Sequence, residues 1–217
     1  MILRMYRYRR VERTCRALCE RLEGGDFYSA TLRDILWKYH GVRAGAYSYG
    51  EGLIPGSFPA GVTIGRYVSI ASGVRVFIRN HPMDRLSSHP FFFNRHLGWL
   101  KEDSVSFGSL AIEHDAWIGG QALITPGCTR IGVGAVVAAG SVVTKDVPDF
   151  AVVAGNPARL LRFRFGEAAI GIILASRWWE KSAAECARFM DHMIRPLGEA
   201  PWLHPLLSEG QSQRNGD

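Results

Sequence analysis

One histidine is a candidate for acid–base chemistry. His81 lies in the run NHPMD at positions 80–84, where a periodic stretch of sequence gives way to a long irregular one. An imidazole can accept and return a proton near neutral pH because its ordinary pKa lies close to that range. Asn80 is either a turn residue or one that orients His81 or an acceptor molecule, and Asp84 is a candidate to orient the loop or bind the acceptor. Residue type and position leave two interpretations open: a general base, or a loop histidine with a local hydrogen bond.

Three further histidines raise the question of a metal site. Zinc catalysis needs three closely grouped protein ligands. His114 stands alone in its part of the sequence, and no histidine occurs between positions 115 and 191. We therefore expect no metal and no zinc lyase, and we expect His89 and His96 to make loop or acceptor contacts.

The elements that would position these residues follow a six-residue repeat. Aliphatic residues recur at Ile64, Ile70, Val76, Ile112, Ile118, Ile124, Ile131, Val137 and Val143, with one step of seven after Ile124. This period predicts a coil with three flat sides whose aliphatic residues stack inward. The step of seven predicts a bulge near residues 128–130. Glycines at 65, 119 and 132 are expected to supply corner conformations.

The repeat divides the chain into four regions. We predict an N-terminal basic helical extension (1–41), with helices over 5–23 and 29–39, and a β-helix domain (42–165) with a long loop at 82–109. A C-terminal helical segment (166–207) and a disordered tail (208–217) follow. The predicted fold class is mainly β. Trp178 and Trp179 are expected to hold the C-terminal helix against the coil.

Composition excludes several classes of protein. The 217 residues are 47% hydrophobic and 21% charged, and no window is long and apolar enough to span a membrane. Four scattered cysteines and the lack of a leader favour a cytoplasmic location. The net charge of +6 is concentrated in the first 21 residues, where seven arginines face two glutamates. This segment is either a solvated helix face or a peripheral contact with the inner face of the membrane. No motif for nucleic-acid binding occurs.

Several motifs together resemble a known family. The stretch ITPGCTRIGVGAVVAAGSVVTKDVPDFAVVAGNPARLL at 124–161, with WIG at 117–119, is similar to the hexapeptide-repeat acyltransferases. The runs NHPMD, HPF, NPA and RWW narrow the resemblance to the xenobiotic acetyltransferase branch, which includes surface-polysaccharide O-acetyltransferases. The similarity covers about residues 42–179. It implies a left-handed parallel β-helix, a homotrimer and acetyl-CoA as co-substrate.

The resemblance also implies roles for individual residues. His81 matches the general base, and a corner N–H near Gly119 is a candidate oxyanion donor. Residues expected at the acceptor are Asn80, Asp84 and Tyr49. Those expected along coenzyme A are Gly119, Ala138, Ala139, Gly140, Lys145, Asn156, Pro157 and Arg159, with the basic groups at the phosphates.

The expected function is therefore acetyl-CoA-dependent O-acetylation of a saccharide hydroxyl, by direct transfer. An antibiotic hydroxyl is the alternative acceptor, and an inactive scaffold or binding module is the alternative of another class. Sequence alone leaves open the identity of the acceptor and whether the acyl group is longer than acetyl.

Overall fold

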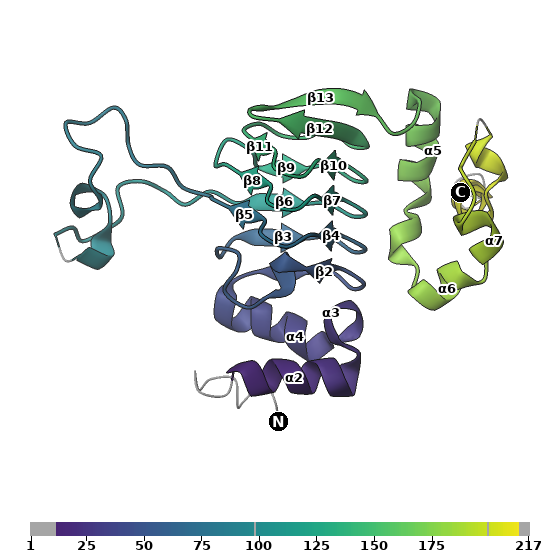
Figure 1. Cartoon of the computed structure of the whole chain (residues 1–217), viewed down its shortest axis with the longest axis horizontal. Helices are drawn as coiled ribbons and strands as arrows, with labels where there is room; N and C mark the ends of the chain where they lie inside the picture. Colours follow the sequence, from purple (N-terminus) through teal and green to yellow (C-terminus); the bar gives the residue numbers. More distant parts are fainter. Residues whose placement is uncertain (1–11, 98, 199, 213–217) are drawn as a thin grey trace.

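A three-sided coil of short parallel strands forms the centre of the molecule (Figure 1). The structure is a computed structural model that describes residues 12–97, 99–198 and 200–212. The first side consists of β1 (Arg43–Ala44), β3 (Val62–Ile64), β6 (Leu110–Ile112) and β9 (Arg130–Ile131). The third side consists of β5 (Arg75–Val76), β8 (Leu123–Ile124) and β11 (Val142–Val143).

The second side is the largest sheet. Its strands are β2 (Tyr49–Gly50), β4 (Ser69–Ile70), β7 (Trp117–Ile118), β10 (Val136–Val137), β12 (Ala151–Gly155) and β13 (Ala158–Phe163). All of its pairs are parallel except β12 with β13, which form an antiparallel hairpin that the repeat did not predict. The expected parallel β-helix is confirmed, and its left-handed winding stays a prediction.

The inward aliphatic residues stack in columns, as the repeat predicts. Ile118 pairs with Ile70 on one side and with Val137 on the other. The other two columns are Ile64, Ile112 and Ile131, and Val76, Ile124 and Val143. None of these nine side chains is more than 8% exposed. Burial of each contributes about 1.5–3 kcal/mol, so the columns are a main source of stability.

The step of seven is absorbed in a turn, as expected. Ile131 still pairs with Ile112, although it lies seven residues after Ile124. The additional residue therefore lies between β8 and β9, where the Cys128 side chain is buried. A bulge there leaves the register of both strands intact.

The expected reason for the repeated glycines is wrong. Gly65, Gly119 and Gly132 do not have positive φ angles. A Cβ on Gly119 would lie 2.5 Å from the backbone nitrogen of Ala139, so close approach of successive turns requires glycine there. Positive φ angles occur three residues after inward aliphatic residues, at Tyr67, Gly73, Asp115, Gln121, Gly134 and Gly140.

Helices close the N-terminal end of the coil. They are α2 (Glu12–Glu23), α3 (Gly25–Tyr28), α4 (Ala30–Ile35) and η2 (Leu36–His40), the last of which is a π-helix. Cys15, Cys19 and Leu32 are fully buried in the same core as the coil, so this region is an end cap. Gly24 ends α2 with φ 75°, as its sequence position predicts. Residues 5–11 of the predicted first helix lie outside the described residues.

The C-terminal region contains several short helices in place of the one expected. These are α5 (Glu167–Ser176), η6 (Trp178–Glu180), α6 (Ala183–Ala187), α7 (Met190–Met193), η7 (Pro201–Leu203) and α8 (Pro205–Ser212). For residues 208–212, where the sequence predicts disorder, the structure has the end of α8, which contacts α5 and whose Leu206 and Leu207 are buried. Residues 213–217 lie outside the described residues. In the described ranges, no helix has both the length and the apolar character to cross a membrane.

Candidate active site

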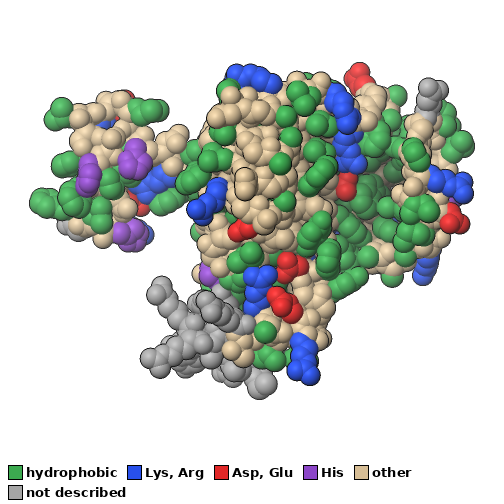
Figure 2. Space-filling view, in the orientation of Figure 1, with side chains coloured by type: hydrophobic (Ala, Val, Ile, Leu, Met, Phe, Trp, Pro, Cys, Tyr) green, Lys and Arg blue, Asp and Glu red, His purple; other side chains and the backbone are tan. Residues whose placement is uncertain are grey.

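A segment between β5 and β6 carries His81 away from the coil (Figure 1). Its only helical turns within the described part are η4 (Pro90–Phe92) and η5 (Arg95–Leu97). Histidine and hydrophobic side chains gather on its surface (Figure 2). The exposed large apolar side chains there are Phe77, Met83, Leu86, Phe91, Phe92, Leu97, Trp99 and Phe107. We call residues 77–109 the projecting segment.

The His81 ring is held in one tautomer. Its Nδ1 lies 2.7 Å from the carbonyl oxygen of Ser88. A carbonyl can only accept a hydrogen bond, so Nδ1 carries the proton and donates. In the neutral tautomer this leaves the lone pair on Nε2, and the residue is exposed. The arrangement therefore directs proton acceptance to Nε2.

The buried Phe93 and the Arg79 that packs on it support the His81 ring. The ring packs edge-on against Phe93, with centroids 5.0 Å apart, and Phe93 is only 4% exposed. Arg79 lies over the rings of Phe93 (4.8 Å) and Phe107 (4.3 Å) and donates to the Phe93 carbonyl at 3.1 Å. Its guanidinium also lies 3.6 Å from the Asp103 carboxylate. Arg79 therefore ties the start of the projecting segment to its return path.

Asp103 is itself fixed in its charged form. The backbone N–H of Arg95 donates to this carboxylate at 3.0 Å. That hydrogen bond, together with the nearby Arg79, lowers the pKa of Asp103 below its ordinary value. The supporting ion pair is consequently retained at neutral pH.

The three residues expected at the acceptor occupy different places. Asn80 and Asp84 are exposed on the projecting segment. Within the described residues, no hydrogen bond joins either of them to His81. Tyr49 lies in β2, 41% exposed, with its ring 4.9 Å from Phe27. The structure therefore does not bring Tyr49 and His81 together within one chain.

A groove of about 830 Å³ runs along the second sheet. Three of the residues expected along coenzyme A line it together: Gly119, Ala138 and Ala139. The half-exposed Trp117 forms part of its wall. Small side chains at successive corners leave space for a narrow, flexible molecule to lie against the backbone.

The other residues expected along coenzyme A lie beyond this groove. Gly140 is exposed at the next corner with φ 69°. Asn156 and Pro157 are exposed in the turn between β12 and β13, and Arg159 follows in β13. The Arg159 guanidinium donates only to the adjacent Ala158 carbonyl among the described residues. Lys145 follows β11 on the third side and does not line the groove.

The N–H of Gly119 itself is excluded as the oxyanion donor that we expect near this corner. The Gly119 N–H donates to the carbonyl of Val137 at 2.8 Å as part of the coil. It has no free N–H to offer an oxyanion, and a donor must come from another group.

Two arginines that line the groove were not predicted from the sequence. Arg162 and Arg164 line its upper end, and Arg164 donates to Asp115 at 3.1 Å. Burial raises the pKa of Asp115 even though Arg164 opposes the shift. The alternation in RLLRFRF could have revealed them, because residues two apart in a strand share one face.

Two of the other histidines, His89 and His114, and the two C-terminal tryptophans have structural partners. His89 accepts from the Phe91 N–H at 3.3 Å at the start of η4. His114 accepts from the Arg66 N–H at 2.9 Å and stacks on Trp179, and burial lowers its pKa. Trp178 packs 5.1 Å from Tyr67, so the expected docking role of both tryptophans is confirmed.

A metal site has no counterpart in this geometry. Across residues 12–97, 99–198 and 200–212, no group of three or more His, Cys, Asp or Glu side chains is arranged to hold a metal ion.

Two relatives named as acetyltransferases are similar to this chain in sequence. A chloramphenicol acetyltransferase of Klebsiella aerogenes is 34% identical over 161 residues, which cover 65% of this chain and 76% of the relative. A chloramphenicol acetyltransferase of Agrobacterium fabrum (strain C58) is 35% identical over 133 residues, covering 58% of this chain. That match spans 63% of the Agrobacterium protein, which is less than two thirds of its length. No family model matches the chain.

Among solved structures, a hexapeptide-repeat acetyltransferase from Vibrio cholerae is 30% identical, with a TM-score of 0.43. The alignment covers 58% of this chain and 64% of that one. Because this TM-score lies below 0.5, the sequence relatives alone carry the assignment.

Proposed function

The chain belongs to the xenobiotic acetyltransferase family of hexapeptide-repeat acetyltransferases, and on that basis we propose that it transfers an acetyl group from acetyl-CoA to a saccharide hydroxyl. The observation that carries the proposal is the His81 tautomer. Ser88 holds the Nδ1 proton, so Nε2 is available as a base. An inactive scaffold would have no need of an exposed imidazole held in this form.

His81 acts as the general base. Its Nε2 accepts the proton of the acceptor hydroxyl while that oxygen attacks the acetyl carbonyl. The tetrahedral intermediate then collapses, the carbon–sulfur bond breaks, and the imidazolium returns the proton to the departing thiolate. Proton and electron pairs balance without a covalent enzyme intermediate. The imidazolium is stabilised by the Ser88 carbonyl, toward which its Nδ1–H points.

Acetyl-CoA occupies the groove on the second sheet. Its pantetheine arm passes the small corners at Gly119, Ala138 and Ala139, which line the groove. Its phosphates lie near the β12–β13 turn, where Arg159 and Arg162 are exposed. Charge-assisted hydrogen bonds from guanidinium groups suit phosphates well.

The active form is a homotrimer. None of the groove-lining residues comes from the projecting segment, so one chain does not place its own groove beside His81. A neighbouring copy can bring its groove to His81 and cover the apolar side chains of that segment. Asn80 and Asp84 of the same segment then contact the acceptor, and Tyr49 of a neighbouring copy can do so.

A saccharide is favoured as acceptor because the run TLRDILWKYHGVRAGAYSYG at 31–50, preceded by the basic helix, resembles extensions in the polysaccharide group. The arginine-rich start of this region suits contact with a membrane on which a lipid-linked precursor is made. Among the described residues, Arg16 already pairs with Glu20 at 3.1 Å, whereas Arg21 is exposed in the last turn of α2. An antibiotic hydroxyl is the second candidate, because the relatives named above are chloramphenicol acetyltransferases.

Thiol release from acetyl-CoA tests the proposal. The full chain is assayed with mono- and oligosaccharides, lipid-linked glycans, chloramphenicol and macrolides. Acceptor-dependent release with a glycan, lost in His81→Asn but kept in the matched control His96→Asn, is expected. Release with an antibiotic alone would replace the saccharide with the second candidate. Neither release nor a coenzyme A shift in Tm would favour the scaffold.

A further inference from the structure

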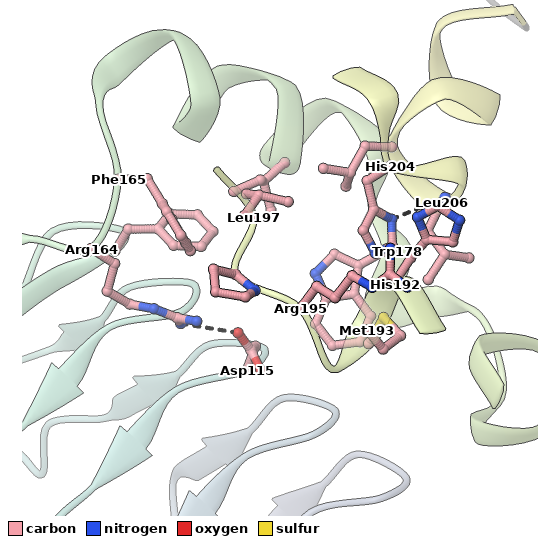
Figure 3. A pocket seen from close by; sticks show the side chains of 14 residues that line it. Asp115, Arg164, Phe165, Trp178, His192, Met193, Arg195, Leu197, His204 and Leu206 are labelled. Atoms are coloured by element: carbon pink, nitrogen blue, oxygen red, sulfur yellow. Dashed lines mark hydrogen bonds and ion pairs between the residues drawn. The ribbon is translucent and has the colours of Figure 1, made fainter. Parts of the chain in front are cut away.

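A second cavity lies between the coil and the C-terminal helices (Figure 3). Its volume is about 390 Å³, within the range of small-molecule pockets. Arg164 and Phe165 face it from the coil side, and His192, His204 and Leu206 face it from the C-terminal side. Neither His81 nor any other residue of the projecting segment lines it, so it is separate from the proposed catalytic centre.

The floor of this cavity is apolar and rigid. Phe150, Ile173, Leu206 and Leu207 are each no more than 4% exposed. The Trp178 ring adds an aromatic wall. An occupant must therefore present a hydrocarbon or aromatic body to these side chains.

The charge around the cavity is positive. Asp115 is the only acidic residue among its lining side chains, and Arg164 already bonds it at 3.1 Å. Arg164 is fixed further by the Gly134 carbonyl at 2.8 Å. Arg195 has no carboxylate partner among the described residues. In the described part of the chain, the Arg195 guanidinium therefore remains to bind an anion at the rim.

Two histidines line the C-terminal side of the same cavity and supply further hydrogen-bonding groups. The rings of His192 and His204 meet edge to face, with centroids 5.7 Å apart. His204 Nδ1 accepts from the Leu206 N–H at 3.3 Å, so its Nε2 carries the proton and can donate. Both Arg195 and the histidines can thus donate hydrogen bonds to an anionic oxygen.

We infer that this cavity is a binding site for an amphipathic monocarboxylate, a molecule with an apolar body and one carboxylate. The carboxylate pairs with Arg195 at the rim, and the body lies against Phe150, Trp178 and Leu207. The Asp115–Arg164 pair lines both this cavity and the groove, so it forms the boundary between the two sites.

Calorimetric titration of the full chain with octanoate tests the inference. Octanol has the same body without the charge, and acetate has the charge without the body. Octanoate is expected to bind one-to-one, and both comparison ligands at least about tenfold more weakly, because a charged hydrogen bond and apolar burial each contribute that much.

Two exposed variants locate the site. Arg195→Gln is expected to weaken octanoate binding about tenfold, and Met193→Trp to block it by filling the cavity, since Met193 lines this cavity and not the groove. Arg188→Gln, an exposed arginine of the same region outside the cavity, is the matched control and should bind like the unaltered chain. Absence of octanoate binding, octanol binding as tightly as octanoate, or unchanged affinity in Arg195→Gln or Met193→Trp would each overturn the inference.

Discussion

In the middle of the coil, an inward side chain such as Ile118 is held between two equivalents from neighbouring turns, whereas His81 in the projecting segment is held by one carbonyl and one ring. Ile118 contacts Ile70 and Val137 and is fully buried. His81 is exposed and depends on Ser88 and Phe93. The comparison separates two tasks: the coil provides stability through repetition, and the projecting segment holds the proposed catalytic base through single contacts. Substitutions in the two regions should therefore affect different measured quantities.

The sharpest test of this difference is His81→Asn. Turnover should fall about 10²–10⁴-fold, because a general base contributes about that much. The free energy of unfolding should change by less than about 0.5 kcal/mol, as for other exposed positions. Steady-state kinetics and urea unfolding on the same preparation measure both. A large loss of stability would show that His81 is a structural residue.

The converse is expected for Ile118→Ala in the coil. Removing a fully buried aliphatic side chain should lower the free energy of unfolding by about 2–5 kcal/mol. Thr63→Ala, on the exposed face of β3, is the matched control and should cost little. Thermal and urea denaturation would report the difference. Equal effects of the two substitutions would contradict the inward stacking.

Two glycines distinguish close approach from backbone conformation. Gly119→Ala places a Cβ 2.5 Å from the Ala139 backbone and should destabilise the coil by about 1–3 kcal/mol or more. At Gly140 nothing lies within 4 Å of an added Cβ, and only the φ of 69° opposes alanine, at about 1–2 kcal/mol. Denaturation curves should rank Gly119→Ala as the worse variant. The reverse order would show that backbone conformation, and not close approach of successive turns, is the stronger reason for glycine in the coil.

Arg79→Met tests the support beneath His81. Loss of the hydrogen bond to the Phe93 carbonyl should lower kcat about tenfold, because a small displacement of the base is costly. Arg95→Met, exposed on the same segment, is the matched control. An unchanged kcat would show that the Phe93 cluster does not position His81.

The smallest expected effect is a pH dependence of stability through His114. Burial lowers its pKa in the folded chain below the unfolded value. Its contribution to stability is therefore complete above about pH 6.5 and decreases as pH falls below that value. Urea unfolding at pH 8 and pH 5.5 should show the loss, and His114→Gln should lessen it. An equal loss in the variant would assign the dependence to other groups.

Periodicity made the coil predictable and left the details of its corners open. The positions of Ile112 and Ile131 follow from spacing alone, including the step of seven between Ile124 and Ile131. The role of Gly119 did not follow, because its constraint is the backbone of the next turn, about twenty residues later in the sequence. Contacts of that range are not visible in a local pattern.

The site was predictable only where a motif or a small residue marks it. His81 was found through NHPMD, and Ala138 through its place at a corner. Ser88 and Arg164 were not found, because a backbone carbonyl has no sequence signature and an arginine just after a strand resembles a solvated charge. The helix α8 was missed for a similar reason: its few apolar residues pair with α5 only in three dimensions.

The two ends of the coil are closed by different elements, and this has a consequence for self-association. Helix η2 packs against β1 at one end, and the antiparallel hairpin β12–β13 covers the other. An open parallel coil offers unpaired strands on which further copies could add end to end, as in a growing fibre. Here the outermost strand, β13, carries Arg159 and Arg162, whose charges oppose such addition. The two caps therefore oppose end-to-end addition of further copies, and deletion of either cap should promote polymerisation.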